Sequence, residues 1–173
     1  MSNFREKLKE VKAFAFDVDG VFSPTKVIMH PTGEPMRSMN IRDGYALQLL
    51  AKKGYPVGII TGGRSKAVFK RFKRLGVTDI YLNSYVKIDQ YQDFKFKYNL
   101  KNEEILYMGD DLPDFEIMKV VGFPTCPADA AEEIINISKY ISPKIGGDGC
   151  VRDILEQYLK IKGEWMDGQA FKW

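Results

Sequence analysis

The sequence of 173 residues predicts an α/β fold in which helices cover both faces of a doubly wound parallel sheet. Short apolar runs alternate along the chain with longer amphipathic segments, as strands and helices do in such folds. Glycine and other turn residues separate these segments, and no repeat or linker interrupts the alternation. A strand, a helix and the next parallel strand connect with right-handed geometry, so this order indicates consecutive βαβ units.

The composition fits one domain, residues 1–173, and argues against several classes of protein. A net charge of +3 is small for a nucleic-acid-binding protein, so we expect no nucleic-acid partner. No apolar run approaches the ~20 residues that span a bilayer, and the N-terminus lacks a signal-peptide pattern. We therefore expect a cytoplasmic protein with no membrane partner. Cys126 and Cys150 form no metal-ligand or disulfide pattern and are expected to be free thiols.

The first third of the chain is expected to supply one strand, a hairpin and a helix. The apolar run Val11–Phe16 is typical of a buried strand. Thr25–His30 and Met36–Ile41 flank a turn-like segment and are expected to form a β-hairpin, within a flap of about residues 22–41. Asp43 is expected to cap a helix that ends at Gly54.

The middle of the chain is expected to supply two further strand–helix pairs. Pro56–Ile60 is an apolar run that stops at a threonine and two glycines, which predicts a second buried strand. Arg64–Leu75 has apolar residues on one face, as an amphipathic helix does. Asp79–Asn83 is predicted to be a third strand, and Val86–Tyr98 a helix rich in lysine and aromatic residues.

The same alternation continues towards the C-terminus. Ile105–Met108 is an unbroken apolar run before Gly-Asp-Asp and predicts a fourth buried strand. The remaining elements are expected to be short helices near Asp114–Val120 and Asp129–Asn136, strands near Gly122–Thr125 and Tyr140–Ile141, and a final helix at Val151–Lys160. Residues 163–173 are expected to be a tail.

The polar residues that point to a function follow the predicted strands. They are Asp17 and Asp19 after the first strand, Thr61 after the second, Lys87 at the start of the helix that follows the third strand, and Asp110, Asp111 and Asp114 after the fourth strand. Ligands of open parallel sheets bind beyond the carboxyl ends of the strands, so these side chains are expected to share one site.

Clustered carboxylates repel one another and need a cation. An all-oxygen set of ligands favours Mg²⁺, which keeps several waters and shares phosphate oxygens with its substrate. Thr61 and Lys87 could hold oxygens of a phosphoryl group, and Gly62 and Gly63 let backbone amides approach it.

Four segments in order resemble the four motifs of the haloacid dehalogenase (HAD) superfamily of phosphohydrolases. They are the sequence FDVDGV at residues 16–21, Thr61-Gly62, Lys87, and the sequence GDDLPD at residues 109–114. The resemblance extends from about Val11 to Ile161. It implies a HAD-like Rossmannoid fold and Mg²⁺-dependent hydrolysis of a phosphomonoester through an aspartyl-phosphate.

The resemblance also implies a role for each motif residue. Asp17 would be the nucleophile, and Asp19 would protonate the leaving oxygen and then activate water. Thr61 and Lys87 would stabilise the phosphoryl oxygens. Gly62, Gly63 and Arg64 would bind the phosphate or the substrate. Mg²⁺ would be held by the Asp17 carboxylate, the Asp19 carbonyl and the Asp110 carboxylate. Asp111 and Asp114 would orient Lys87 or metal-bound water.

The motif spacing leaves no room for a cap domain. Asp19 and Thr61 are 42 positions apart and Thr61 and Asp110 are 49 apart, which the predicted elements fill. Among capless members, the hairpin and the segments Met39–Gly44 and Gly146–Asp153 resemble those of the 3-deoxy-D-manno-octulosonate 8-phosphate (KDO 8-phosphate) phosphatases. This implies release of KDO and phosphate for lipopolysaccharide biosynthesis, by a homotetramer in which a neighbour's hairpin and tail close the site.

Several alternatives stay open from the sequence. The same chemistry could act on keto-deoxynonulosonate (KDN) 9-phosphate or a sialic acid phosphate. A receiver-like signalling domain also gathers acids, threonine and lysine around Mg²⁺, but the motif order argues against it. A structural HAD module without activity would be expected to lack Asp17 or Asp19.

The motifs do not settle the roles of two segments, the loop at Gly63 and Arg64 and the C-terminal tail. Many superfamily members have arginine directly after Thr-Gly, whereas here Gly63 places Arg64 one position later. The aromatic residues of the tail, Trp165, Phe171 and Trp173, either pack on their own subunit or dock on a neighbour.

Overall fold

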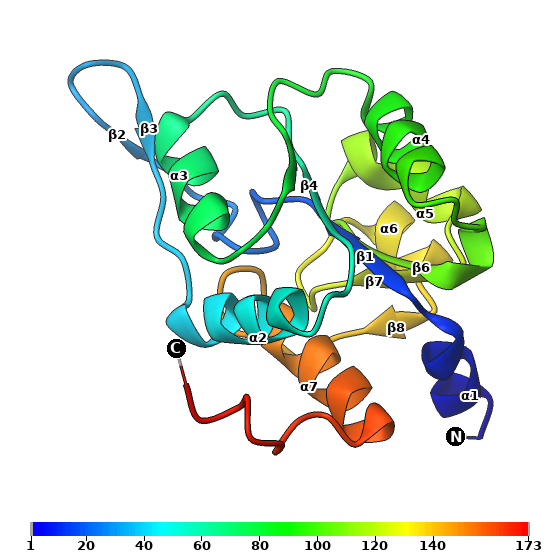
Figure 1. The fold of residues 1–173 in the computed structure, drawn as a ribbon. Helices are drawn as coiled ribbons and strands as arrows, with labels where there is room; N and C mark the ends of the chain where they lie inside the picture. The colour runs from blue at the N-terminus through cyan, green and yellow to red at the C-terminus, as the bar shows by residue number, and fades with distance from the viewer. Residues whose placement is uncertain (1, 173) are drawn as a thin grey trace.

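A computed structural model, which describes residues 2–172, confirms the predicted α/β class (Figure 1). Six parallel strands form one sheet in the order β5-β4-β1-β6-β7-β8, and β2 and β3 form a separate antiparallel hairpin. The strands of the sheet are β1 (Ala13–Phe16), β4 (Val57–Ile60), β5 (Asp79–Tyr81), β6 (Ile105–Met108), β7 (Phe123–Cys126) and β8 (Tyr140–Ile141). The hairpin strands are β2 (Ile28–Met29) and β3 (Pro35–Met36).

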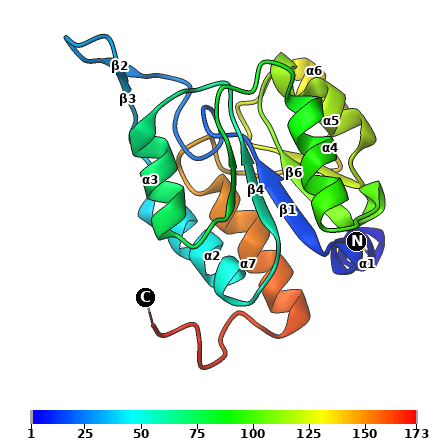
Figure 2. The same ribbon diagram turned by 45° about the horizontal axis from the view of Figure 1, so that its top comes forward.

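Helices connect the strands and cover both faces of the sheet, as Figure 2 shows. The helices are α1 (Ser2–Glu10), α2 (Ile41–Lys52), α3 (Lys66–Arg74), α4 (Lys87–Lys97), α5 (Phe115–Val120), α6 (Glu132–Ile137) and α7 (Cys150–Lys162). Two short 3-10 turns, η1 (Asn102–Glu104) and η2 (Leu112–Asp114), flank β6. Among the described residues, no helix combines the length and the apolar character that crossing a bilayer requires.

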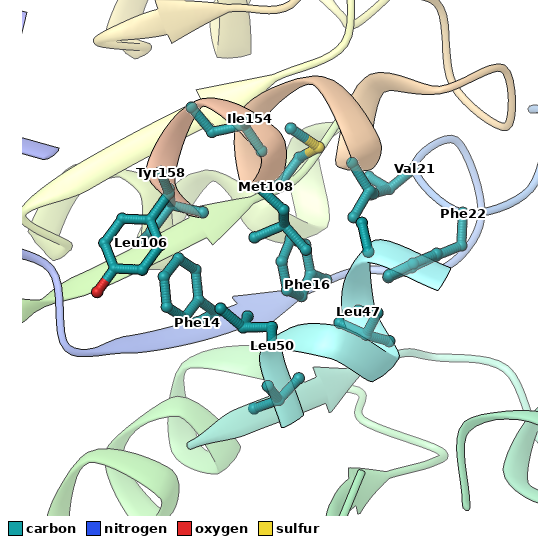
Figure 3. Packing of buried hydrophobic residues seen from close by; sticks show 14 of the residues in the cluster. Phe14, Phe16, Val21, Phe22, Leu47, Leu50, Leu106, Met108, Ile154 and Tyr158 are labelled. Carbon is teal, nitrogen blue, oxygen red and sulfur yellow. The ribbon is translucent and has the colours of Figure 1, made fainter. Parts of the chain in front are cut away.

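The alternation of side chains along β1 divides the core into two layers. Phe14 and Phe16 face α2 and α7, where they pack among the large apolar residues drawn in Figure 3. Ala13 and Ala15 point to the other face, which α4, α5 and α6 cover. On this second face Gly58 of β4 leaves room for α4, since a Cβ there would lie 3.1 Å from the Phe94 ring.

The strand order places a topological switch point at β1. The chain passes from β1 to β4 and β5 on one side and then returns to β6 on the other side of β1. The carboxyl ends of β4, β1 and β6 are therefore neighbours, and the loops that follow them open at one edge of the sheet. Asp17, Thr61 and Asp110 lie in these loops.

The N-terminal helix α1 is an element that the sequence analysis did not predict. Its Leu8 is fully buried, and Phe4 stacks edge-on against Phe123 with ring centroids 5.6 Å apart. Phe4 and Leu8 are four positions apart on an otherwise polar segment, which is the minimal pattern of an amphipathic helix.

The prediction that Asp43 caps the second helix is wrong. Asn40 caps α2, since its side-chain oxygen accepts the amide of Arg42 at 2.8 Å. Asp43 lies buried in the first turn of α2, and its carboxylate accepts the amides of Gly149 at 3.1 Å and Arg152 at 2.6 Å. Gly149 is the N-cap of α7 and has no side chain, so Asp43 supplies the cap of α7 from another helix.

Replacing Asp43 with alanine is expected to lower the free energy of unfolding by about 1–3 kcal/mol, because buried amides at the start of α7 lose their acceptor. Burial raises the pKa of Asp43 to about 6, against the amides that lower it. A raised pKa means that wild-type stability falls as the pH rises from about 4 to 6. The loss in Asp43→Ala should therefore be larger at pH 5 than at pH 8. Urea denaturation at both values measures this, and a loss that grows with pH would contradict it.

The described part of the C-terminal tail packs on its own chain. Trp165 is 8% exposed and lies under the Arg152 guanidinium, 4.2 Å from the ring centroid. The Tyr45 hydroxyl donates to the carbonyl of Ala170. Phe171 is 70% exposed. Of the two alternatives for the tail, packing on the same subunit therefore holds for Trp165, while Trp173 lies outside the described residues.

Candidate active site

One cleft of about 480 Å³ gathers the sequence-predicted site residues at the edge of the sheet. Every predicted site residue except Arg64 lines it: Asp17, Asp19, Thr61, Gly62, Gly63, Lys87, Asp110, Asp111 and Asp114. Four further residues line the cleft: Thr25, Ser84, Tyr85 and Pro113. The loops after β1, β4, β5 and β6 all contribute.

Lys87 links two of the acids at the base of the cleft. It begins α4, and its side chain is only 5% exposed. Its ammonium lies 2.9 Å from Oδ1 of Asp17 and 2.7 Å from Oδ1 of Asp114. Burial opposes the charged form of Lys87, but Asp17 and Asp114 outweigh it and raise the pKa of the ammonium. Lys87 is therefore charged at neutral pH.

Asp114 is the most heavily bonded acid of the cluster. Its Oδ1 also accepts the Tyr107 hydroxyl at 2.5 Å, and its Oδ2 accepts the amide of Asp110 at 3.2 Å. Gly109 makes this approach feasible, since a Cβ there would lie 2.5 Å from atoms of the Asp114 side chain. Asp114 is thus fixed by three donors from β6, its loop and α4, and it orients Lys87.

The cluster carries more negative charge than Lys87 neutralises. Carboxylate oxygens of Asp17, Asp110 and Asp114 all lie within 4.8 Å of one another and are buried. Burial and the charge of Asp114 raise the pKa of Asp17 well above its usual range, although Lys87 opposes this. The same two causes raise the pKa of Asp110 to about 7. Three carboxylates facing one ammonium fit a divalent cation bound through oxygen ligands.

The loop after β1 folds tightly against Asp110. The amides of Val21, Phe22 and Ser23 all donate to the carbonyl of Val18, which closes the loop on itself. Gly20 has φ +85°, and a Cβ there would lie 1.9 Å from Oδ2 of Asp110. A glycine is therefore required for Asp110 to stand next to Asp17.

Asp19 pairs with Arg37 and does not belong to the group of three clustered acids. Arg37 donates two hydrogen bonds to the Asp19 carboxylate, with Nε 2.5 Å from Oδ1 and Nη2 2.8 Å from Oδ2. The Ser23 hydroxyl donates to Oδ1 at 2.9 Å. Burial opposes ionisation, but the hydrogen bonds from Arg37 and Ser23 prevail and lower the pKa of Asp19. The expected contact of the Asp19 carbonyl with a metal stays a prediction.

Thr61 lies at the end of β4 with its side chain buried. Its hydroxyl oxygen accepts the amide of Gly63 at 3.1 Å, which leaves the hydroxyl proton available for another acceptor. The loop after β5 braces this turn, because the amide of Ser84 donates to the carbonyl of Thr61 at 3.0 Å.

Asp111 and Arg64 lie at the margin of the cleft. The Asp111 carboxylate accepts the amide of Leu112 at 2.8 Å and caps η2, so Asp114 and not Asp111 makes the contact with Lys87. The Arg64 side chain is exposed and lines a neighbouring pocket. Its guanidinium donates to Asn83 Oδ1 at 2.7 Å and to the Tyr85 hydroxyl.

Three residues that line the cleft or contact its acids were not predicted from the sequence: Arg37, Tyr85 and Tyr107. Arg37 comes from the end of the hairpin, 18 positions after Asp19, and no local pattern marks it. Tyr85 lies between Asn83 and Lys87 in a loop with no recognisable motif. The position of Tyr107 could have been predicted, because neighbouring residues of a strand point to opposite faces of the sheet. Tyr107 therefore points to the face that α4 covers, opposite to Met108.

Comparisons with known proteins agree with this geometry. Residues 74–154 match the family described as haloacid dehalogenase-like hydrolase. The 3-deoxy-D-manno-octulosonate 8-phosphate phosphatase KdsC of Escherichia coli K12 is 33% identical over 158 residues, which cover 91% of this chain and 84% of KdsC.

Two solved structures superpose on nearly the whole chain. The 3-deoxy-D-manno-octulosonate 8-phosphate phosphatase from Moraxella catarrhalis, in complex with magnesium, phosphate and KDO, has a TM-score of 0.89 and 34% identity. The alignment covers 93% of this chain and 92% of that one. The corresponding phosphatase from Yersinia pestis has a TM-score of 0.89, 31% identity and coverage of 92% and 86%. The chain belongs to the KdsC family of haloacid dehalogenase-like hydrolases.

Proposed function

We propose that this protein is a Mg²⁺-dependent phosphatase that hydrolyses KDO 8-phosphate to KDO and phosphate. The observation that carries the proposal is the buried cluster of Asp17, Lys87, Asp110 and Asp114 with Asp19 beside it. The similar Moraxella phosphatase, whose structure holds magnesium, phosphate and KDO, supports both the chemistry and the substrate.

Asp17 is the group placed to attack phosphorus. Lys87 holds its Oδ1, which leaves the other carboxylate oxygen for attack. That oxygen forms a bond to phosphorus while the bond to the C8 oxygen of the sugar acid breaks, giving an aspartyl-phosphate. Lys87, the Thr61 hydroxyl and the amides of Gly62 and Gly63 stabilise the charge on the phosphoryl oxygens.

Asp19 handles the protons in both steps. It donates a proton to the leaving oxygen, and the resulting carboxylate then accepts a proton from the water that attacks phosphorus. Attack of that water breaks the aspartyl-phosphate, releases phosphate and restores the Asp17 carboxylate. Arg37 favours the ionised form of Asp19, so the pair between them must open before Asp19 can act as an acid.

The acids fit a magnesium ion that Asp17, Asp110 and the Asp19 carbonyl would hold, with Asp114 orienting the cluster. When bound, Mg²⁺ would neutralise charge on the phosphoryl group and on the carboxylates. Asp17 would otherwise resist ionisation, since burial and Asp114 raise its pKa.

Magnesium is expected to stabilise the fold more at pH 8 than at pH 5. The pKa of Asp110 is about 7 in the metal-free protein, above the ordinary 3.8, so metal-free stability falls as the pH rises from about 4 to 7. Protons compete with the metal below pH 7, whereas at pH 8 binding removes the repulsion. Thermal unfolding with Mg²⁺ or with a chelator, at both pH values, measures this. An equal shift in melting temperature at both would contradict it.

A phosphate-release assay over sugar-acid phosphates with Mg²⁺ tests the substrate. We expect KDO 8-phosphate to be preferred over KDN 9-phosphate and a sialic acid phosphate. A preference for either of those two would keep the chemistry and change the substrate. A preference for a hexose phosphate or a nucleotide would overturn the sugar-acid assignment.

The assembly and location are further parts of the proposal. The hairpin carries a group of exposed apolar side chains: Val27, Ile28, Met29 and Met36. Such a group favours burial against other copies, so we infer one domain of residues 1–173 that forms a homotetramer, in which a neighbour closes the cleft. Light scattering tests this, and a monomer at working concentration would contradict it. The free, buried thiols of Cys126 and Cys150 suit a cytoplasmic protein.

A further inference from the structure

We propose that Asn83 and Tyr85 are positioning residues that hold Arg64 at the rim of the cleft, where its guanidinium binds the carboxylate of the sugar acid. This inference rests on the proposed function. It assigns a task to the loop after β5, which contains no motif residue.

The contacts of Arg64 fix its side chain at both ends of the guanidinium group. Nε donates to Asn83 Oδ1 at 2.7 Å, and Nη2 donates to the Tyr85 hydroxyl. The guanidinium carbon also lies 5.7 Å from the centroid of the Tyr85 ring. Two of the five N–H groups of arginine are thus used, and those of the Nη1 side remain for a ligand.

The backbone holds the two loops in register. The amide of Asn83 donates to the carbonyl of Gly63 at 3.0 Å, directly before Arg64. Asn83 has φ +58°, a left-handed conformation that asparagine tolerates better than most residues. This conformation lets one residue contact Gly63 with its amide and Arg64 with its side chain.

Arg64 and its partner Tyr85 line two neighbouring cavities. Tyr85 lines the catalytic cleft together with Gly62 and Gly63. Arg64 lines the neighbouring pocket, where Arg37 and Lys66 add further positive charge beside Glu34. In this proposal the phosphate lies over Asp17 and the carboxylate end of the sugar acid reaches Arg64, because an anionic carboxylate is a group that arginine recognises through paired N–H donors.

The arrangement also accounts for the position of Arg64 in the sequence. With Gly63 after Thr61-Gly62, the arginine leaves the turn one residue later and ends at the exposed start of α3. A free arginine there would lose rotamer freedom on binding a ligand. Asn83 and Tyr85 restrict that freedom before the substrate arrives.

A double-mutant cycle tests the inference with two substrates, KDO 8-phosphate and p-nitrophenyl phosphate, which has no carboxylate. The measured quantity is the ratio of kcat/KM for the first over the second. Arg64→Ala is expected to lower this ratio about 10–100-fold, as loss of a hydrogen bond to a charged group does. Asn83→Gly and Tyr85→Phe should each lower it about 2–10-fold, through KM.

The cycle separates positioning from a merely structural role. In the Arg64→Ala background, Asn83→Gly should have no further effect on the ratio. Asn99→Gly is the matched control, because Asn99 also has a positive φ, at +51°, but lies at the far end of α4. It should leave the ratio unchanged.

Two results would overturn the inference. One is an Asn83→Gly effect that persists without Arg64, and the other is an equal effect on both substrates. A wild-type protein that cleaves p-nitrophenyl phosphate but not KDO 8-phosphate would instead overturn the proposed function, and this inference with it.

Discussion

Asp17→Asn is expected to abolish phosphate release, with a loss of about 10⁴-fold or more in kcat, as for removal of other catalytic nucleophiles. The amide nitrogen or oxygen cannot replace the carboxylate oxygen that forms the bond to phosphorus. The loss should be similar for all phosphomonoesters, because the same carboxylate oxygen must form the bond to phosphorus whichever group leaves. Phosphate release and mass spectrometry of the trapped phosphoenzyme measure the two consequences.

The fold of the Asp17→Asn variant is expected to survive, which makes the result interpretable. Asparagine removes one buried negative charge from the cluster that Asp110 and Asp114 share, so metal-free stability should be equal or higher. Asp89→Asn is the matched control, since Asp89 is an exposed acid in the first turn of α4. Turnover in Asp17→Asn above about 1% of wild type would refute the nucleophile assignment.

The sequence predicted the sheet and the base of the cleft because both depend on local patterns. Buried parallel strands are short apolar runs, and two predicted strands, Ile105–Met108 and Tyr140–Ile141, have the observed bounds. Their carboxyl ends must meet at one edge, so Asp17, Thr61 and Asp110 follow from strand positions alone. The contact of Lys87 with Asp17 follows from the same rule.

The features that the sequence did not predict depend on contacts between distant segments. The position of Asp43 in the sequence predicts a cap for the helix that follows it. Only the packing of α2 against α7 shows that Asp43 caps α7 instead. Arg37 reaches Asp19 from the segment directly after β3, and no local pattern in the sequence specifies that contact. Local sequence patterns therefore predict the residues of the catalytic cluster better than they predict the residues that contact this cluster from distant segments.

The segment around Gly146 shows a related difference. Consecutive glycines predict a flexible loop, yet this loop is packed against the loop after β1. A Cβ on Gly146 would lie 2.0 Å from the carbonyl oxygen of Gly20. The glycines serve close approach between two backbones, which sequence composition does not distinguish from flexibility.

Lys87→Met is expected to lower the free energy of unfolding by about 3–5 kcal/mol at pH 8 without metal, because it leaves buried acids without their partner. The raised pKa of Lys87 means that its contribution is fully present at neutral pH and is lost only as the pH rises through that value. Without the ammonium the acids take up protons more readily in the folded state. The destabilisation should therefore shrink as the pH falls from 8 to 5.

Activity separates the two tasks of Lys87 in this variant. Mg²⁺ supplies positive charge to the same cluster and should restore part of the stability, yet it cannot replace the hydrogen bond from Nζ to Asp17. We expect kcat to stay about 10²–10³-fold below wild type at saturating Mg²⁺, even where denaturant titration shows a folded protein. Lys70→Met, on the exposed surface of α3, controls for loss of a lysine and should change neither quantity. A Lys87→Met variant as stable as wild type at pH 8 in chelator would show that this ammonium does not balance the acids. Recovery of kcat with Mg²⁺ would show that its role is charge alone, because the metal restores charge without restoring the bond that orients Asp17.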